Sequence, residues 1–342
     1  MRAWWKGKGG AMLRKEEADF TFVDAAFIHK AKKWKDHWLK KILDIVNWKP
    51  FEKIFRGLYS RDEGRPAWEP VKLFRCLLLA EWYGMSDRAL EEAMTFRIDF
   101  IKFSGLPIDE AAPDATTFVV FRRRIQRYWD KMMRILKKEL EEAGYSINKA
   151  VAVDATLVEA HSRPQKEYGT GEVSGGDDEA AWRGYPARKK KGDDGNEVQT
   201  RKPPMFGYKL NITASVGTGF ISGFTVCPAN EHESKHFEEL IRKDMEAVYG
   251  DKGYSGNRKY LKRRGIVDKL QAKGVRGRPL TQKEIARNKS ITKKRRIVEG
   301  VFGSLKQWYG WRKTRFWGLA RNKLAISLSA IAWNMKKWVK YA

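Results

Sequence analysis

Asp154 is the first of three acidic side chains whose settings suit a metal ligand. It interrupts the apolar run Val151-Ala-Val-Asp154-Ala-Thr, which reads as a strand with apolar residues on both faces. A carboxylate buried in such a strand needs a compensating charge, and a divalent cation commonly provides it. The alternative is an Asp at a strand end that accepts backbone hydrogen bonds, so Asp154 alone leaves both roles open.

Asp251 is the second acidic candidate. Residues 245–251 read as a short strand ending in this carboxylate, and the glycine-containing turn Lys252-Gly253-Tyr254-Ser255-Gly256 follows. The carboxyl end of a strand in an α/β sheet is a common position for a functional residue. Lys252, directly after the strand, is a candidate phosphate contact.

Glu299 is the third candidate, within residues 294–308, which read as a helix. At about 100° per residue it lies on a narrow polar stripe between Arg295 and Lys306. Beside that stripe is an apolar face expected to pack on the sheet, formed by Val298, Val301, Phe302, Leu305 and Trp308. A surface ion pair between Arg295 and Glu299 would produce the same spacing, so the helix alone leaves this simpler interpretation open.

The order of these elements says more than any one of them. A strand with Asp154, a hairpin, a helix, a strand with Asp251 and a helix with Glu299 form the outline of an RNase H-like fold. Three carboxylates converging there would hold two Mg²⁺ ions roughly 4 Å apart, with Mn²⁺ as an alternative ion. This arrangement predicts in-line displacement at phosphorus, with Arg295 and Lys306 holding phosphates near the scissile bond.

The hydrophobic pattern also predicts the elements between the carboxylates. Residues 208–216 alternate apolar and polar side chains, which indicates a strand with one buried face, and Gly217-Thr218-Gly219 turns into a second strand at 220–227. We interpret the glycine-rich and charged stretch from about 162 to 204 as a mobile basic loop. Its candidate DNA contacts are Lys189, Lys190 and Lys191, which follow Arg188, and its acidic pairs at 177–178 and 193–194 are expected to be solvated.

The first 145 residues read as helical after a basic arm at 1–27. Within 66–103 a helix, a break at Gly84-Met85 and a second helix capped by Ser86 resemble a helix-turn-helix. Glu91 and Glu92 on the second helix would face phosphates badly, so packing or dimerisation is the alternative role.

A long helix is expected from Asp114, its N-cap, to about Ala143. Its candidate phosphate contacts are Arg122, Arg123 and Arg124. A solvated helix face is the alternative interpretation of this run of charges.

Composition supports a polyanionic partner. The chain has 342 residues, 42% of them hydrophobic, and a formal net charge of +27 that is spread along its length. An extended nucleic-acid surface fits this distribution. No apolar run approaches the length of a membrane-spanning helix and no secretory signal is evident, which argues against a membrane partner. Cys76 and Cys227 imply no disulfide framework and fit the cytoplasm.

A zinc site is a weaker alternative near the predicted metal pair. Cys227, His232 and His236 have the spacing Cys-x4-His-x3-His. Only three ligands are present, and they straddle a strand and a turn, which disfavours zinc.

The sequence resembles the DDE transposases of bacterial insertion sequences, of the insertion-sequence-5 type. The resemblance covers about residues 50 to 340. It is carried by Val151-Ala-Val-Asp154-Ala-Thr, by Gly250-Asp251-Lys-Gly-Tyr254 and by Arg295-(x3)-Glu299-(x6)-Lys306, which matches the Arg–Glu–Lys part of that group's Tyr-Arg-Glu-Lys signature. The signature tyrosine would fall at position 292, where this chain has Thr292.

The resemblance implies a double-stranded DNA substrate. A homodimer on paired ends would cut at terminal inverted repeats and join the 3′ ends to target DNA, in the nucleoid of a prokaryote. The domains would be the arm at 1–27, a helical DNA-binding or dimerisation domain at 28–145, an RNase H-like catalytic domain at 146–320 and a C-terminal packing helix at 321–342. Two alternatives remain: an RNase H-like nuclease or resolvase without strand transfer, and a catalytically silent DNA-binding protein.

Overall fold

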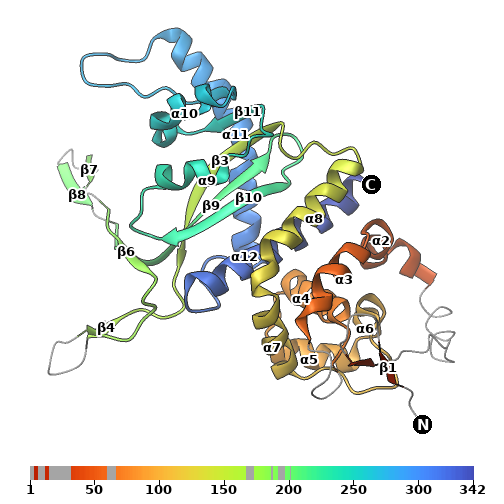
Figure 1. Cartoon of the computed structure of the whole chain (residues 1–342). Helices are drawn as coiled ribbons and strands as arrows, with labels where there is room; N and C mark the ends of the chain where they lie inside the picture. The colour runs from red at the N-terminus through yellow and green to blue at the C-terminus, as the bar shows by residue number, and fades with distance from the viewer. Residues whose placement is uncertain are drawn as a thin grey trace. The chain divides into compact units, whose positions relative to one another are not determined.

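The computed structural model describes residues 4–6, 12–14, 32–59, 67–166, 173–185, 188–191, 197–200 and 202–342. The chain divides into two compact units (Figure 1). We call the first, residues 1–145 with 324–342, the helical unit, and the second, residues 146–323, the sheet unit. The functional domains expected from the sequence stay predictions.

The helical unit is built from short helices around a core of phenylalanines. Its helices are α2 (Trp38–Ile45), α3 (Lys49–Phe55), α4 (Pro70–Tyr83), α5 (Asp87–Phe96), α6 (Ile98–Ser104), α7 (Ala115–Ile125), α8 (Trp129–Glu142) and the part of α12 (Leu319–Tyr341) that begins at Leu324. Seven phenylalanines are at most 1% exposed: Phe51, Phe55, Phe74, Phe100, Phe103, Phe118 and Phe121. In the N-terminal arm, β1 (Trp4–Lys6) pairs antiparallel with β2 (Met12–Arg14).

The predicted helix, turn and capped helix are confirmed in α4 and α5. Gly84 ends α4 with φ +64°, which is accessible to glycine at little cost, and the Ser86 hydroxyl accepts a hydrogen bond from the amide of Ala89. The acidic residues of α5 have internal partners. Asp87 forms a bidentate ion pair with Arg122 of α7, and Glu91 accepts a hydrogen bond from the backbone amide at the start of α7. These contacts favour packing as the role of α5.

The prediction of a single long helix from Asp114 to Ala143 is wrong. Asp114 does cap α7, because its side chain accepts a hydrogen bond from the amide of Thr117 at 2.6 Å. A 3-10 turn at Gln126–Tyr128 then separates α7 from α8. At this turn the Tyr128 ring packs edge-on against Phe55, and neither Pro nor Gly marks the interruption in the sequence.

The sheet unit contains a six-stranded mixed sheet, so the predicted RNase H-like α/β class is confirmed. Its strands are β3 (Ala150–Glu159), β6 (Ala181–Arg183), β9 (Met205–Ser215), β10 (Ile221–Pro228), β11 (Ala247–Gly250) and β12 (Val267–Leu270). The main order is β10-β9-β3-β11-β12, with β6 also paired to β9. Strands β9 and β10 run antiparallel to their neighbours, whereas β11 is parallel to both β3 and β12.

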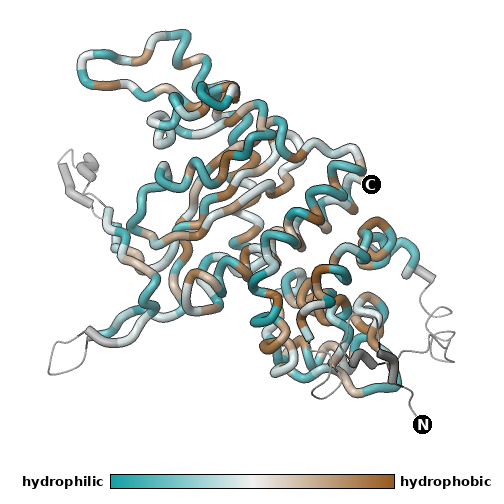
Figure 2. Tube along the Cα trace, viewed as in Figure 1, coloured by the Kyte–Doolittle hydropathy of each residue, from teal (hydrophilic) through white to brown (hydrophobic). Residues whose placement is uncertain are grey.

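Helices cover both faces of this sheet. A cluster that includes Val151 and Val153 of β3 packs under α9 (Phe237–Leu240) and α10 (Arg258–Arg263). The opposite face carries Asp154 and contacts the 27-residue helix α11 (Gln282–Trp308). Figure 2 shows hydrophobic segments along the strands between these helices. Within the described part of the chain, no helix is long and apolar enough to cross a membrane.

The prediction that β9 has a solvated polar face is wrong. The polar residues of that face are at most 6% exposed: Lys209, Asn211, Thr213 and Ser215. The segment after β10 covers them, and hydrogen bonds satisfy most of their polar atoms, although Asn211 Oδ1 is buried without a partner among the described residues. The Lys209 ammonium donates to the backbone oxygen of Glu231, and the Asn211 amide donates to the Thr225 hydroxyl at 3.1 Å.

The described residues between 162 and 204 include strands, whereas a loop was expected. They contribute β6 to the sheet and form two small antiparallel pairs, β4 (Gln165–Lys166) with β5 (Val173–Ser174) and β7 (Arg188–Lys191) with β8 (Glu197–Thr200). Asp177 is not solvated, since it is 3% exposed and accepts a hydrogen bond from the amide of Gly318. The neighbouring Glu179 caps the start of α12 in the same way. The pair at 193–194 lies outside the described residues.

Candidate active site

The sheet brings Asp154 and Asp251 to the same face of neighbouring strands. β3 and β11 are parallel, and Ala152 lies opposite Tyr249. Because side chains alternate along a strand, the residues two positions further, Asp154 and Asp251, lie on the face covered by α11. The two carboxylates interact electrostatically, because the charge of Asp251 contributes to raising the pKa of Asp154.

Asp154 is a largely buried carboxylate with one cationic partner. Its side chain is 19% exposed, Oδ2 lies 2.6 Å from Arg295 Nη1, and Oδ1 accepts a hydrogen bond from the amide of Ala155. Burial raises the pKa of Asp154 to about 6, although Arg295 acts in the opposite direction. A carboxylate that the fold discourages from ionising, despite an arginine in contact, is typical of a functional site.

Asp251 is positioned by the turn that follows β11. Its Oδ1 accepts a hydrogen bond from the amide of Gly253 at 2.7 Å and caps a 3-10 helix at Lys252–Asn257. The preceding residue, Gly250, has no room for a side chain. A Cβ there would lie 2.7 Å from the Leu270 side chain and 3.1 Å from that of Val153. The glycine lets the end of β11 approach its neighbouring strands closely, so the carboxylate follows directly at the carboxyl end of this central strand.

The helix α11 adds Glu299 through Arg295. The guanidinium of Arg295 contacts Asp154 with one nitrogen and Glu299 Oε1 with the other, at 2.8 Å. The predicted ion pair within the helix therefore exists, and Asp154 joins it. Arg295 is 15% exposed and Glu299 is 50% exposed at the side chain, so the site opens to solvent on the Glu299 side. In this structure Arg295 supplies the positive charge between the two carboxylates.

The sequence interpretation missed Glu233, a further carboxylate beside Asp251. A Cβ built on Gly253 would lie 2.6 Å from Glu233 Oε1 and 2.9 Å from Asp251 Oδ1, so these oxygens are within about 5.5 Å of each other. Burial raises the pKa of Glu233, and Asp251 raises it further. Glu233 begins a 3-10 helix after β10, where no periodic pattern exists, and only its place after a predicted strand signalled it.

Tyr254 adds a polar atom next to these carboxylates. Its side chain is 0% exposed, and its hydroxyl has no hydrogen-bond partner among the described residues. Burial raises the pKa of Tyr254, and the carboxylates of Glu233, Asp154 and Asp251 all add to this effect. A buried, unpartnered hydroxyl among acidic groups is suited to a hydrogen bond with a bound ligand or water.

The donor set suits a divalent cation in its chemistry. The acidic side chains supply oxygen ligands only, which is the preference of Mg²⁺ and Mn²⁺. Within the described residues, however, no group of three or more His, Cys, Asp or Glu side chains is close enough to hold an ion as it stands. Arg295 lies between Asp154 and Glu299, and its movement would free both carboxylates. The structure gives no support to the zinc alternative. Burial raises the pKa of the Cys227 thiol to about 11, which disfavours the thiolate, and His236 pairs with Glu231.

The other predicted phosphate contacts have varied positions. Lys306 is half-buried on α11, and burial lowers its pKa, whereas Lys252 is exposed beside Asp251. Lys189, Lys190 and Lys191 lie in β7, where only the backbone is described. Trp308 does not pack on the sheet as expected, because it is 69% exposed at the end of α11.

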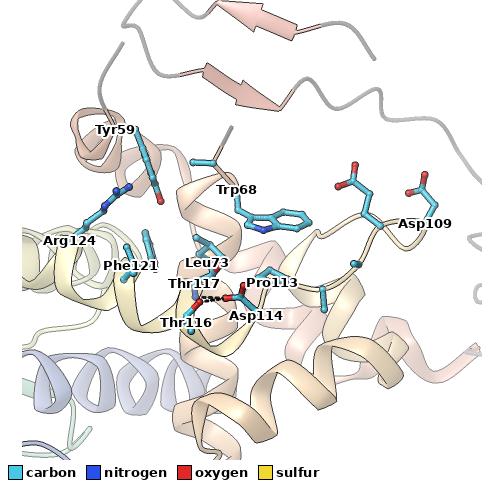
Figure 3. Close-up of a pocket in the computed structure, with 15 residues that line it drawn as sticks. Tyr59, Trp68, Leu73, Asp109, Pro113, Asp114, Thr116, Thr117, Phe121 and Arg124 are labelled. Atoms are coloured by element: carbon cyan, nitrogen blue, oxygen red, sulfur yellow. Dashed lines mark hydrogen bonds between the residues drawn. The ribbon is translucent and has the colours of Figure 1, made fainter. Parts of the chain in front are cut away.

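The arginines of α7 lie in the helical unit. Arg122 is paired with Asp87, Arg123 is exposed, and the Arg124 guanidinium stacks over the Tyr59 ring at 4.6 Å. Arg124 also lines a cavity of about 520 Å³ with Trp68 and Asp114 (Figure 3). Acidic side chains on the rim, among them Asp109 and Glu110, make this cavity unsuited to phosphate.

A mixed sheet of this order, with one carboxylate within the central strand β3, a second directly after the neighbouring strand β11 and a third on the covering helix, defines an RNase H-like domain of the DDE class. Comparison with known families agrees. A family described as a transposase domain (DUF772) matches residues 27–124, and a family described as a transposase DDE domain matches residues 146–335. The second match covers more than half of the chain, so the protein belongs to the DDE-domain transposases.

A comparison with solved structures also found a distant likeness. The cryo-EM structure of the piggyBac transposase synaptic complex with hairpin DNA is 12% identical, over 88% of this chain and 76% of that chain, with a TM-score of 0.40. A likeness this distant carries no functional argument. The type of insertion sequence expected from the motifs, the insertion-sequence-5 type, stays a prediction.

Proposed function

We propose that this transposase cleaves DNA at the terminal inverted repeats of its insertion sequence and joins the freed 3′ ends to a target. The observation that carries this proposal is the placement of Asp154, within β3, and Asp251, directly after the adjacent strand β11, on one face of the sheet, with Glu299 joined to Asp154 through Arg295. We assign these three carboxylates as the catalytic and metal-binding residues.

Asp154, Asp251 and Glu299 would hold Mg²⁺, or Mn²⁺ in its place. Bound there, divalent ions supply Lewis-acid chemistry to an in-line displacement at phosphorus, in which water or a 3′-hydroxyl attacks and a 3′ oxygen leaves. Asp154 must be ionised to act as a ligand. Its pKa of about 6 means that most molecules carry this charge at neutral pH, but few do so below pH 5.

Arg295 has a second role in this proposal. If Asp154 and Glu299 held a cation, the guanidinium of Arg295 would become available to a phosphate of the bound strand. A guanidinium binds phosphate oxygens in a bidentate manner, which orients the scissile bond for attack. Lys252, which follows Asp251 directly, and Lys306, which follows Glu299 on α11, would hold neighbouring phosphates.

Double-stranded DNA is the partner that this reaction requires, and paired ends call for two copies of the chain. We therefore propose a homodimer on the DNA, acting at the nucleoid of a prokaryotic cell. Arg123 and Lys189 to Lys191 would contribute phosphate contacts away from the carboxylates, and Arg122 and Arg124 would do so only by leaving their present partners.

The direct experiment incubates the full chain with a linear fragment carrying candidate element ends, a plasmid target and Mg²⁺. We expect cleavage at the ends and plasmid joined to the fragment, and we expect Glu299→Gln to show neither while it still binds the fragment. Cleavage without joined product would indicate the RNase H-like nuclease or resolvase. Binding with no cleavage by the unaltered chain would indicate a silent DNA-binding protein.

A further inference from the structure

A basic projection follows the last strand of the sheet. We call residues 271–290 the limb: the loop after β12 and the first turns of α11, which extend beyond α10 in Figure 1. We call Val275–Pro279 at its end the tip. All five tip residues are exposed, and Val275 is 59% exposed despite its apolar side chain.

The tip is a tight turn with arginines at two of its corners. Val275 and Arg278 exchange backbone hydrogen bonds of 3.2 and 3.0 Å, which leaves Arg276 and Gly277 as the two central residues. Gly277 has φ +82°, and no residue other than glycine has positive φ in the described part of the chain, so the geometry is that of a type II turn. The order Arg-Gly-Arg thus places two guanidinium groups around a residue that has no side chain.

The base of the limb is held by side chains that bond to the backbone. Asn288 both donates to the carbonyl of Ala272 and accepts from its amide, and Thr292 accepts a hydrogen bond from Gln271 at 2.7 Å. Arg287 and Arg258 each donate to the carbonyl of Leu270. Thr292, which stands where the family signature has tyrosine, therefore has a structural role here. A fixed base with an exposed tip is a rigid projection.

The charge of the limb fits a polyanion. Between residues 271 and 290 the sequence has six basic residues and one acidic residue, Glu284. Glu284 caps the start of α11 and contacts Arg278 at 3.1 Å, and the Arg278 side chain remains 75% exposed. An exposed pair of this kind contributes little stability, so a stronger anionic partner can displace it.

We propose that the tip inserts Arg276 and Arg278 into the minor groove of an A·T-rich segment of duplex DNA. This inference rests on the proposed function, because it assigns part of the DNA contact of the transposase. A·T-rich segments have a narrow minor groove with enhanced negative potential, which attracts arginine side chains. Gly277 lets the backbone approach the groove floor, and the exposed Val275 suits the apolar sugar walls.

Contact with phosphates alone is the competing interpretation of the same residues. It requires positive charge but neither arginine nor a turn, so the lysines on the limb would serve equally well. Minor-groove insertion instead depends on the planar guanidinium and on base composition. The two interpretations therefore differ in sequence preference and in their response to replacement of arginine by lysine.

The test measures binding of the full chain to matched A·T-rich and G·C-rich duplexes in EDTA, where no cleavage occurs. Binding is followed by fluorescence anisotropy over a range of salt concentrations. The variants are Arg276→Ala with Arg278→Ala, the same pair changed to Lys, and the control Lys283→Ala with Lys289→Ala, which removes two charges from the same limb. We expect the unaltered chain to bind the A·T-rich duplex about tenfold more tightly than the G·C-rich duplex. Both the Arg→Ala pair and the Arg→Lys pair should lose this preference, whereas the lysine control should keep it.

Netropsin, which occupies the minor groove of A·T-rich DNA, should compete with the unaltered chain and much less with the double arginine variants. The proposal would be overturned if the Arg→Ala pair and the Lys283→Ala, Lys289→Ala control lost the same affinity on both duplexes. That result would leave phosphate contact as the only role of the tip. Thermal unfolding checks that α11 is intact, because Arg278 contacts its cap, and Arg276→Ala alone tests the tip if the double variant unfolds. Failure of the cleavage chemistry would not alter any of these binding measurements.

Discussion

The acidic side chains of α5 in the helical unit and those of the candidate site in the sheet unit have opposite surroundings. In the helical unit, Asp87 is neutralised by a bidentate contact with Arg122, and Glu91 caps the backbone of α7. In the sheet unit, the charge of Asp251 raises the pKa of both Asp154 and Glu233, and Arg295 is the cation in contact with Asp154 and Glu299.

This difference separates charges that serve the fold from charges that serve a reaction. A carboxylate with a dedicated partner stabilises the packing around it, and its removal affects stability first. Several carboxylates brought together with too little positive charge destabilise the folded state unless a cation is added. The surroundings of a carboxylate therefore predict whether its loss affects stability or chemistry, and five substitutions test this division.

The largest expected effect is the loss of catalysis when the sheet carboxylates are changed. Asp154→Asn and Asp251→Asn should each reduce Mg²⁺-dependent DNA cleavage by about a thousandfold or more, because an amide is a poor ligand for a hard cation. The matched control is Asp87→Asn, which should keep the cleavage rate and lower the free energy of unfolding by about 1–3 kcal/mol. Substantial cleavage by either sheet variant would remove that residue from the proposed site.

Arg295→Gln should separate stability from metal binding. Without its guanidinium, the buried carboxylate of Asp154 loses its cationic partner, which we expect to cost about 3 kcal/mol at pH 8 and less at pH 5, where the carboxylate is protonated. Added Mn²⁺ should raise the melting temperature of this variant more than that of the unaltered chain. Arg296→Gln, at an exposed position of the same helix, is the control. Equal responses to Mn²⁺ would show that Arg295 and a cation do not occupy the same place.

Glu233→Gln tests whether the carboxylate missed in the sequence belongs to the reactive group. We expect its Mn²⁺ affinity and its cleavage rate to fall roughly tenfold, because a nearby charge that assists the ligands is lost while the size of the side chain is kept. Glu238→Gln, exposed at the start of α9, should change neither quantity. If Mn²⁺ titration gives the same affinity for both variants, Glu233 is only a structural neighbour of Asp251.

Glu139→Gln gives the smallest effect and tests the helical unit. Glu139 accepts a hydrogen bond from the amide of Asn47, but its other oxygen is buried without a partner, and burial raises its pKa to about 7. A carboxyl group whose folded pKa is raised loses its stabilising contribution as the pH rises, here between about 4.5 and 7. The variant should therefore be more stable than the unaltered chain at pH 8, by about 1 kcal/mol, and similar at pH 5. Chemical denaturation at the two pH values measures this, and a pH-independent difference would contradict the assignment.

Patterns with a clear period predicted most of the sheet. The alternation from Tyr208 corresponds to β9, and the turn at Gly217-Thr218-Gly219 leads into β10. The apolar run around Asp154 corresponds to β3. These patterns also placed Asp154 and Asp251 on strands that prove to be neighbours. Local sequence contains this information because the period of side-chain alternation is a property of the strand itself.

What the sequence did not predict depends on contacts between distant segments. The polar face of β9 is buried because the segment after β10 covers it, and Asp177 is buried because Gly318 donates to it from 141 positions away. Trp308 satisfied the helical period of α11 but lies beyond the part of the helix that the sheet covers. Periodicity identifies which residues share a face, and only the tertiary fold decides how far that face is covered.

The fixed base of the limb has a consequence for how this protein can be altered. Asn288, Thr292, Arg287 and Arg258 close the loop at its root, and none of them belongs to the five exposed residues at its end. Apart from Gly277, whose positive φ suits glycine, those positions can therefore be exchanged as a cassette while the carboxylates stay in place. If the tip makes the proposed contact, a library varied at 275, 276, 278 and 279 would sample new DNA preferences and leave the carboxylates unchanged.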